Sequence, residues 1–231
     1  MKIAGLQKVS LIDYPEHIAA TVFLAGCNLN CGYCHNRWML SEAKVTEALS
    51  VQAFLGWLET RVGLLDGVCI TGGEPTIHRE LRDLVHAIKA LNLQVKLDTN
   101  GTHPDRLSLL LNDGALDFVA MDIKAPLDER YDEVAGCHVD LGAIRESMSL
   151  LRSRALNYEF RTTVGPSLDE RALEEIAREM RGDEHWFLQT FERVPGLDPS
   201  LSDAPALTRD ELVDIVGRLA HLMPAVRLRG D

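Results

Sequence analysis

The sequence GCNLNCGYCH at residues 26–35 sets three cysteines, Cys27, Cys31 and Cys34, in a C-x3-C-x2-C array. The array follows an apolar run at residues 18–24 that is typical of a buried strand. Cysteine thiolates are the usual protein ligands of iron–sulfur clusters, and four of them normally complete a four-iron cluster. Three ligands at this spacing, with no fourth cysteine nearby, would leave one iron open to a substrate or cofactor. The array therefore indicates a reactive centre instead of a structural staple.

Length and composition are those of an ordinary globular enzyme. The chain has 231 residues, 46% of them hydrophobic, and a net charge of −11. No run rich in lysine or arginine stands out, so we expect neither a nucleic-acid partner nor a membrane partner. The N-terminus lacks the apolar core of a signal peptide, and five cysteines, three of them in one loop, do not make a secreted disulfide framework. We expect a cytoplasmic protein with one domain, residues 1–231.

Short apolar runs alternate with amphipathic helical stretches along the chain. One helix is predicted to start near Ser50 and another to span residues 81–91. Two later helices are predicted to start at pairs with capping-box spacing, Ser167 with Glu170 and Thr208 with Glu211. Repeated βα units predict parallel strands with outer helices, and about six units are too few for an eight-stranded barrel. The predicted fold is therefore α/β, an open partial (β/α)6 barrel. The predicted strands are residues 19–24, 67–71, 93–97, 116–121, 158–164 and 186–189.

Polar groups occur at the carboxyl ends of these strands, where parallel α/β folds place their functional sites. The pair Gly72-Gly73 lets the backbone come close to a ligand. Glu74 beside it can accept hydrogen bonds from an ammonium group, and Lys124 and Arg161 can pair with a carboxylate. Together these groups suit a zwitterionic amino acid attached to a nucleoside. The polar residues at or near these strand ends are Glu74, Asp98, Asn100, Asp122, Lys124, Arg161 and Gln189.

The motifs resemble those of the radical S-adenosylmethionine (SAM) superfamily, in which an aromatic residue, here Tyr33, precedes the last cysteine and a Gly-Gly-Glu loop follows the second strand. The resemblance extends to the glycyl-radical-enzyme activases, and among them to the anaerobic ribonucleoside-triphosphate reductase activating proteins. It covers essentially the whole chain. The stretches that carry it are GLQKVSLIDYP (5–15), TVFLAGCNLNCGYCHN (21–36), TGGEPT, LDTNG, MDIKAP, FRTTV, FLQ and the terminal VRLRG.

The resemblance implies a mechanism. Cys27, Cys31 and Cys34 would hold a [4Fe–4S] cluster, and the amino and carboxylate groups of SAM would chelate its open iron. Reductive cleavage of the sulfonium would yield a 5′-deoxyadenosyl radical, which would abstract a hydrogen atom from a glycine of a partner, an anaerobic (class III) ribonucleotide reductase. A flavodoxin or ferredoxin would donate the electron. Because the cofactor supplies the chemistry, we assign no catalytic acid or base.

The resemblance also assigns roles to individual residues. It places the amino group of SAM near Gly72, Gly73 and Glu74, and its adenine near Tyr33. Asp98 and Asp122 match positions that contact SAM or a nearby monovalent cation in related activases. Some of those activases have a histidine near the end of the sixth strand, where this chain has Gln189. The further residues expected to contact SAM are Asp98, Asn100, Asp122, Lys124, Arg161 and Gln189.

Three alternatives remain at this point. The chain could activate another glycyl-radical enzyme, as a pyruvate formate-lyase activase does, or it could be a small-molecule radical SAM enzyme similar to 7-carboxy-7-deazaguanine synthase. The cysteine array with His35 could also make a closed Cys3His zinc site, which gives the Gly-Gly-Glu loop no role. Elsewhere, Cys69 is expected to be a buried thiol, Lys96 to lie on the solvated surface, and residues 194–206 to connect to the last helix.

Overall fold

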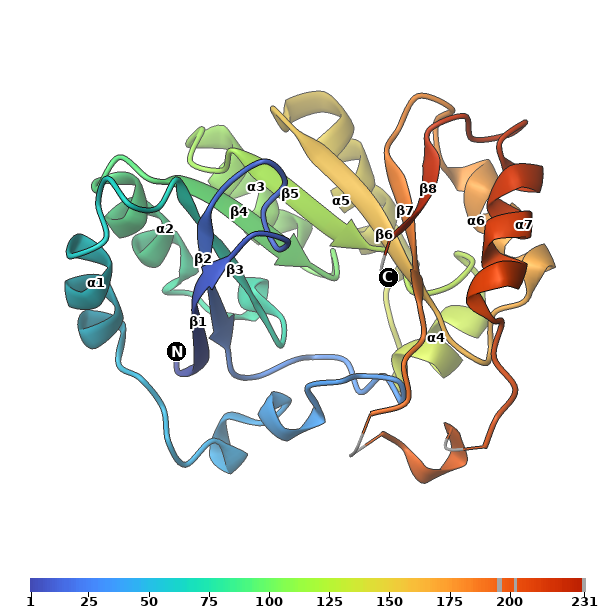
Figure 1. Cartoon of the computed structure of the whole chain (residues 1–231), viewed down its shortest axis with the longest axis horizontal. Coiled ribbons are helices and arrows are strands. Elements are labelled where there is room, and N and C mark those ends of the chain that lie inside the picture. The colour runs from blue at the N-terminus through green and yellow to red at the C-terminus, as the bar shows by residue number, and fades with distance from the viewer. Residues whose placement is uncertain (195–196, 202, 230–231) are drawn as a thin grey trace. The chain divides into compact units, whose positions relative to one another are not determined.

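The computed structural model describes residues 1–194, 197–201 and 203–229. The described residues form eight strands that are hydrogen-bonded to one another in chain order, from β1 to β8 (Figure 1). The strands are β1 (Ile3–Ser10), β2 (Ala19–Leu24), β3 (Gly67–Gly72), β4 (Gln94–Thr99), β5 (Phe118–Asp122), β6 (Tyr158–Val164), β7 (Trp186–Thr190) and β8 (Val226–Arg229).

Helices occupy most of the connections between the strands. The α-helices are α1 (Val51–Glu59), α2 (Leu81–Lys89), α3 (Pro104–Asn112), α4 (Arg130–Ala135), α5 (Leu141–Arg154), α6 (Glu170–Glu179) and α7 (Arg209–Leu219). Short 3-10 turns are η1 (Arg37–Met39), η2 (Glu42–Lys44), η3 (Pro75–Ile77) and η4 (Pro199–Leu201). No helix within the described ranges is long and apolar enough to cross a membrane.

The predicted parallel α/β sheet is confirmed. All six predicted strands are present, and β2–β3, β3–β4, β6–β7 and β7–β8 pair in parallel. Two strands were not predicted: β1, which pairs antiparallel with β2, and β8, which follows the last helix. These two strands end the order at either edge, so the sheet is open, as expected.

Contacts within the chain divide it into two compact units, and each is described by itself. The first unit comprises Met1–Asn28, Trp38–Ala120 and Gly142–Tyr158. The second unit comprises Leu29–Arg37, Met121–Leu141 and Glu159–Asp231. The boundary passes through the cysteine array, because Cys27 belongs to the first unit whereas Cys31 and Cys34 belong to the second.

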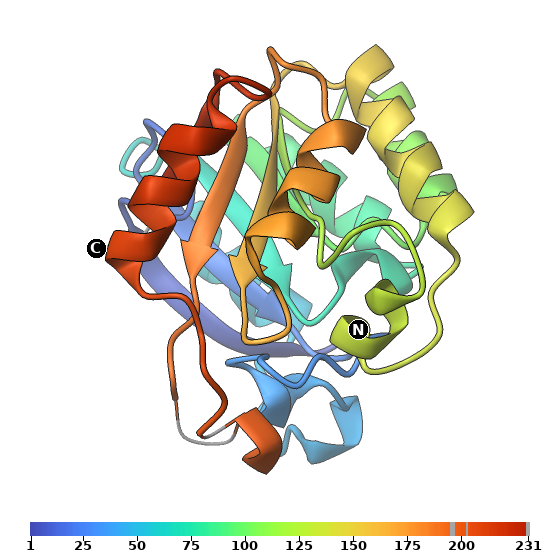
Figure 2. The ribbon, with the colours of Figure 1, turned by 90° about the vertical axis from the view of Figure 1, so that its right-hand side faces the viewer.

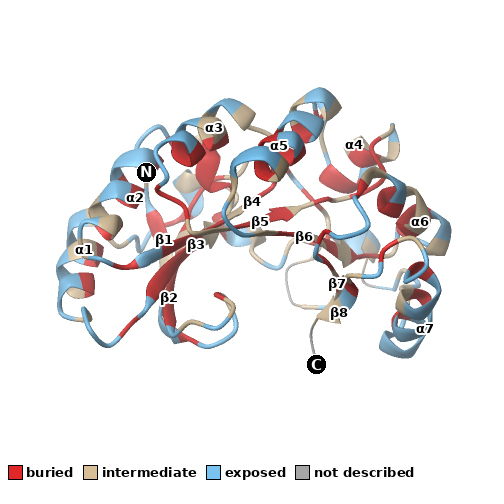
Figure 3. Ribbon diagram, turned by 90° about the horizontal axis from the view of Figure 1, so that it is seen from above, coloured by how far each residue is buried: buried red, intermediate tan, exposed pale blue. Residues whose placement is uncertain are grey.

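The core of the first unit lies between its strands and its helices. Figure 3 shows α1, α2 and α3 on the same side of the strands. Helix α1 begins at the predicted N-cap, Ser50, whose hydroxyl accepts a hydrogen bond of 3.1 Å from the backbone of Ala53. Helix α2 contacts β4 and buries one apolar face, and each such side chain contributes about 1.5–3 kcal/mol on burial. That face consists of Leu81, Leu84, Val85 and Ile88.

The second unit is organised around β7 and β8. Helix α7 packs against both strands and contacts α6 (Figure 2). Its predicted capping box is confirmed, since the Thr208 hydroxyl accepts from the Glu211 backbone and the Glu211 carboxylate accepts from Thr208. Trp186 of β7 is fully buried, and its Nε1 donates a hydrogen bond of 3.0 Å to the hydroxyl of Thr162.

The predicted start of α6 is wrong by two residues. The helix begins at Glu170 with Asp169 as its N-cap, and the Asp169 carboxylate accepts a hydrogen bond of 2.8 Å from the backbone of Ala172. Ser167 instead lies in a turn closed by the backbone of Leu168, which donates to the carbonyl of Gly165. Capping-box spacing alone therefore identified the wrong cap, because Ser167 belongs to the preceding turn and Asp169 caps the helix.

Two predicted segments are only partly described. Residues 195, 196 and 202 of the connection at 194–206 lie outside the described residues, as does Gly230 of the terminal VRLRG. Within that connection, η4 precedes α7, and the backbone of Asp198 donates to the carbonyl of Gly32. The connection therefore meets the cysteine array within the second unit.

The corrected cap gives a first prediction. Asp169→Ala should lower the free energy of unfolding by about 1 kcal/mol, because one backbone N–H at the start of α6 loses its acceptor. Ser167→Ala is the matched control and should change stability by much less, because this hydroxyl caps no helix. Urea unfolding followed by circular dichroism measures both; equal losses for the two variants would contradict the assignment of the cap.

Candidate functional site

The end of β3 approaches the segment before the cysteine array too closely for any residue except glycine. Gly72 has a φ of +118°, and a Cβ there would lie 2.4 Å from the backbone nitrogen of Leu24. A Cβ on Gly73 would lie 1.9 Å from the carbonyl oxygen of Gly26. The backbone N–H groups of Gly73 and Glu74 donate to the carbonyls of Leu24 and Gly26, each at 2.8 Å. The Gly-Gly-Glu loop is thus fixed against residues 24–26, which directly precede the cysteine array.

The carboxylate of Glu74 joins the ends of β3 and β4. Glu74 is 1% exposed, and its Oε1 accepts hydrogen bonds from the backbone and hydroxyl of Thr76 and from the hydroxyl of Thr99. Its Oε2 accepts one from the backbone of Asn100 at 2.6 Å. Burial raises the pKa of the Glu74 carboxyl above its usual value, although these hydrogen bonds favour the charged form. The side chain expected to meet an ammonium group therefore also holds the loop in place.

Asn100 extends this network toward the array. Its Nδ2 donates a hydrogen bond of 3.0 Å to Oδ1 of Asn28, the residue after Cys27. Its Oδ1 accepts from the backbone and hydroxyl of Thr102, whose hydroxyl in turn accepts from Asn28. Glu74 and Asn100 are therefore brought together in the first unit, in a network that includes the segment next to Cys27.

Asp98 is paired with a lysine that we expected on the surface. Lys96 is only 1% exposed, and its ammonium forms a short ion pair with the Asp98 carboxylate. The same ammonium lies 3.7 Å from the sulfur of Cys69, which is buried in β3 as predicted. The expectation for Lys96 was wrong because it considered residue type alone. Its spacing of two from Asp98 along a strand places both side chains on one face, and that signal was available in the sequence.

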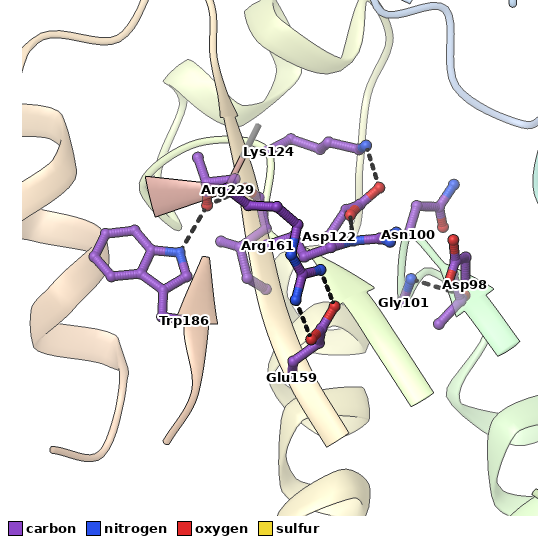
Figure 4. Close-up of polar contacts among 12 residues, drawn as sticks. Asp98, Asn100, Gly101, Asp122, Lys124, Glu159, Arg161, Trp186 and Arg229 are labelled. Carbon is purple, nitrogen blue, oxygen red and sulfur yellow. Dashed lines mark hydrogen bonds and ion pairs between the residues drawn. The ribbon is translucent and has the colours of Figure 1, made fainter. Parts of the chain in front are cut away.

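In the second unit, Asp122 lies between two cationic side chains (Figure 4). Its Oδ2 is 2.9 Å from the ammonium of Lys124, and its Oδ1 is 2.8 Å from Nε of Arg161. Burial opposes the charge on Asp122, but the attraction of Arg161 and Lys124 outweighs it and holds the pKa of this carboxyl well below its usual range. The predicted residues Asp122, Lys124 and Arg161 therefore form one charged cluster.

Tyr33 lies against this cluster. The Lys124 ammonium is 5.8 Å from the centre of the Tyr33 ring, a distance at which a cation and an aromatic ring attract. Tyr33 is 9% exposed, and no residue of the described chain forms a hydrogen bond with its buried hydroxyl. The backbone of Gly165 faces the same ring, since a Cβ there would lie 3.7 Å from it. A buried hydroxyl with no partner among the described residues suits a site that receives a ligand.

Cys31 is held close to the same cluster. Its thiol is buried, and burial raises the pKa of the thiol although Lys124 opposes the shift. Arg37 donates a hydrogen bond of 3.0 Å to the backbone carbonyl of Cys31, and the backbone of Cys34 donates to the same carbonyl at 3.1 Å. In the first unit, the backbone of Cys27 donates to the carbonyl of Leu40. Each array cysteine is thus anchored through its own backbone or that of its neighbour.

A cavity of about 260 Å³ opens beside Tyr33 in the second unit. It lies between the cysteine array, α4, the β6–α6 turn and η4. Residues from each of these segments line it: Asn30, Gly32, Tyr33, Glu133, Val134, Gly136, Gly165, Pro166, Ser167, Leu168, Asp198, Ser200 and Leu201. The part played by α4 was not predicted, since Glu133 and Val134 belong to no motif.

The remaining predicted residues lie apart from this cluster or add little to it. Gln189 is in β7, in register with Thr163 of β6 and Arg229 of β8. His35 is exposed. The segment before Cys137 packs against the array, because the Asn30 backbone donates to the Ala135 carbonyl at 2.9 Å. No three His, Cys, Asp or Glu side chains in the described ranges are grouped as a metal site. The array itself supplies three thiols from one loop, and thiols are the usual protein ligands of iron–sulfur clusters.

Comparison with known proteins identifies the family. Residues 21–180 match the radical SAM superfamily. The chain belongs to this superfamily of enzymes. The match begins within β2, ends just after α6, and includes the cysteine array, the Gly-Gly-Glu loop and the charged cluster at Asp122. Membership in the superfamily leaves the zinc alternative without support.

Individual relatives agree with this placement. The chain is 31% identical, over 94% of its length and 91% of the relative's, to a protein of Methanocaldococcus jannaschii named provisionally as a glycyl-radical enzyme activating enzyme. It is 29% identical to the pyruvate formate-lyase-activating enzyme of Clostridium pasteurianum, over 58% of this chain and 57% of that one. Among solved structures, the fold is similar to that of SuiB of Streptococcus suis bound to S-adenosylmethionine, with a TM-score of 0.69, 12% identity, and coverage of 91% of this chain and 52% of that one. The predicted radical SAM type of α/β fold is thereby confirmed.

The cluster at Asp122 gives a second prediction. Asp122→Asn should destabilise the protein at neutral pH by about 3–5 kcal/mol, because Lys124 and Arg161 lose their shared counter-ion. Since the folded-state pKa of Asp122 lies below its unfolded value, the stabilisation is present above about pH 3.9 and is lost as the pH falls through the folded-state value. Thermal unfolding of both proteins between pH 7 and pH 2.5 measures the difference. It should shrink by up to about 1.4 kcal/mol per pH unit below pH 3.9. A difference that stays constant over this range would contradict the assignment.

Proposed function

We propose that this protein is a glycyl-radical-enzyme activase whose partner is an anaerobic (class III) ribonucleotide reductase. The observation that carries the proposal is the near full-length similarity to a relative named as an activating enzyme, over 94% of this chain. The motifs at 5–15 and 21–36, which resemble those of reductase activating proteins, support this partner over pyruvate formate-lyase. We further propose that both units form one radical SAM domain, residues 1–231, because the superfamily match at 21–180 takes in segments of each.

The proposed cluster ligands are Cys27, Cys31 and Cys34. Three thiols leave one iron of a [4Fe–4S] cluster without a protein ligand, which suits chelation by the amino and carboxylate groups of SAM. When bound, the reduced cluster and SAM would supply the electron transfer and the hydrogen abstraction; the chain's residues bind, orient and exclude water. A flavodoxin or ferredoxin is the proposed electron donor. We place the protein in the cytoplasm, where reducing conditions keep such cysteines as thiols.

The charges at Asp122 support the proposed SAM contacts in the second unit. Asp122 carries one negative charge, whereas Lys124 and Arg161 carry two positive charges. Among these three side chains there is one positive charge in excess, which favours an anionic group such as the carboxylate of SAM. We assign Lys124 to that carboxylate and Arg161 to the fixing of Asp122. Gln189 of β7 is proposed as a further SAM contact.

The cavity beside Tyr33 supports the proposed place of the adenine. Its volume of about 260 Å³ is below the roughly 300–1,000 Å³ of sites that enclose whole cofactors, so it suits one part of SAM. The Tyr33 ring and the side chain of Leu168 offer apolar surface, and the Gly165 backbone allows close approach. In the first unit, the Gly72-Gly73 backbone is assigned to the amino group of SAM, with Glu74 fixing the loop. Asp98 and Asn100 are proposed to border the same cofactor.

The experiment for this function is anaerobic activation. The reconstituted and reduced protein is incubated with SAM and an anaerobic ribonucleotide reductase, and electron paramagnetic resonance should detect a glycyl radical doublet. The matched control is the same reductase with its radical glycine replaced by alanine, which should give no doublet. A parallel reaction with pyruvate formate-lyase tests the alternative partner.

Each result of that experiment distinguishes the candidates. A doublet only with pyruvate formate-lyase would reject the reductase as partner. SAM cleavage with neither partner would favour a small-molecule enzyme such as one similar to 7-carboxy-7-deazaguanine synthase. No SAM cleavage by the reduced protein would contradict the proposed function altogether.

The cysteine assignment gives a separate prediction. Wild-type protein reconstituted with iron and sulfide should hold about four irons per chain, and alanine at Cys27, Cys31 or Cys34 should abolish the intact cluster. Cys69→Ala is the control, because that thiol is buried in β3 outside the array. Iron analysis and electron paramagnetic resonance of the reduced protein measure the outcome. An intact four-iron cluster in the Cys31→Ala variant would remove Cys31 from the ligands.

A further inference from the structure

The most unusual charged side chain in the first unit is Lys96. Among the described lysines and arginines, Lys96 is the only buried one, with 1% exposure. A buried ammonium is costly unless a counter-ion and hydrogen bonds compensate it. Its partners here are the carboxylate of Asp98 and the sulfur of Cys69. An apolar side chain of similar size would satisfy packing at this position, so stability does not account for a lysine.

The position of Lys96 is set by strand geometry. Lys96 and Asp98 are two residues apart in β4, so their side chains leave the same face of the sheet. Lys96 is directly in register with Cys69 of β3, which explains why its ammonium reaches that sulfur as well. The Lys96 ammonium therefore reaches Asp98 along the face of β4. Asp98 is the residue before the last one of β4, and Asn100, whose backbone donates to Glu74, follows the strand.

The carboxylates that the resemblance assigns to a monovalent cation are already neutralised by the chain. Asp98 carries one negative charge and is paired with Lys96. Asp122, in the second unit, is paired with both Lys124 and Arg161. An alkali-metal ion binds where oxygen ligands carry excess negative charge, and a second cation beside an ammonium would be repelled. These residues therefore do not fit a bound alkali-metal ion.

We propose that the Lys96 ammonium is a built-in cation that takes the place of an alkali-metal ion at Asp98. Its role is that of a positioning residue: it holds the Asp98 carboxylate in one orientation at the end of β4. Because the cation is covalently part of the chain, SAM binding needs no alkali-metal ion from solution. The inference rests on the proposed function, because it takes Asp98 as part of the SAM site.

The test compares SAM affinity in three salts. The cluster-loaded protein is titrated with SAM under anaerobic conditions in sodium, potassium or choline chloride at equal ionic strength. Wild-type affinity should be the same in all three. Lys96→Met, which keeps the length of the side chain but removes the charge, should lose affinity about tenfold in choline, equivalent to about 1.4 kcal/mol, and regain it in potassium or sodium. Lys89→Met is the matched control and should behave as wild type, because Lys89 pairs with Asp117 on the helical side.

Restoration by an alkali-metal ion separates this role from a purely structural one. A packing defect at Lys96 would weaken binding equally in every salt, and that result would overturn the inference. A wild-type protein that itself needs sodium or potassium would overturn it too, as would full affinity of Lys96→Met in choline.

A second measurement tests the inference even if Lys96→Met does not fold or the wild-type protein does not bind SAM. Thallous ion, which substitutes for potassium, is titrated into wild-type protein without SAM and followed by thallium NMR. We expect no saturable thallium binding at Asp98 in the wild-type protein. A saturable site that is present in wild type and lost in Asp98→Asn would contradict the inference. Failure of SAM binding in all three salts would instead count against the proposed function, which this ion titration does not involve.

Discussion

The buried carboxylate of Glu74 is the interaction on which the arrangement of the first unit depends. It accepts hydrogen bonds from Thr76, Thr99 and Asn100, and its own backbone N–H donates to Gly26. One side chain thus connects the end of β3 with the end of β4 and with the entrance to the cysteine array. A neutral amide could not accept all these hydrogen bonds, because its nitrogen is a donor. Glu74 thereby holds in place the loop that follows Gly72-Gly73.

In the second unit, the positive charge of Lys124 is kept beside the buried thiol of Cys31. Burial raises the pKa of Cys31, whereas Lys124 opposes the shift. Asp122 in turn keeps Lys124 charged, and the pKa of that ammonium lies well above its usual value because the attraction of Asp122 outweighs the cost of burial. The result is a preorganised positive charge over the Tyr33 ring. Preorganised charge of this kind can orient an anionic ligand group without first being rearranged.

Several elements could be predicted because their signal is local. The bounds of β2 and β6 match the predicted ones, and Ser50 and Thr208 cap the helices they were expected to cap. The edge strands β1 and β8 were missed because an exposed edge strand lacks a continuous apolar run. β1, for example, has polar and exposed residues in its centre. The N-cap of α6 was missed because a neighbouring turn decides which side chain faces the helix. Lys96 was misplaced because burial of a lysine depends on a partner in the fold.

The site shows the same division between local and spatial information. Motif spacing and resemblance placed the cysteine array, the Gly-Gly-Glu loop and the Asp122 cluster at strand ends. They did not reveal that Glu74 and Asn100 are engaged with the chain itself, that α4 lines a cavity beside Tyr33, or that Asp98 has its own ammonium. Each of these depends on contacts between residues at least 25 positions apart, or on the direction in which a strand presents its side chains.

We propose that the three thiols of the cysteine array leave one iron of the cluster for SAM. The most direct measurement is electron–nuclear double resonance of the reduced protein with SAM labelled at its amino nitrogen or carboxylate oxygen. We expect hyperfine coupling between the cluster and each label, because both groups would be iron ligands. Bound SAM without coupling to either label, in a protein whose cluster is reduced, would contradict it.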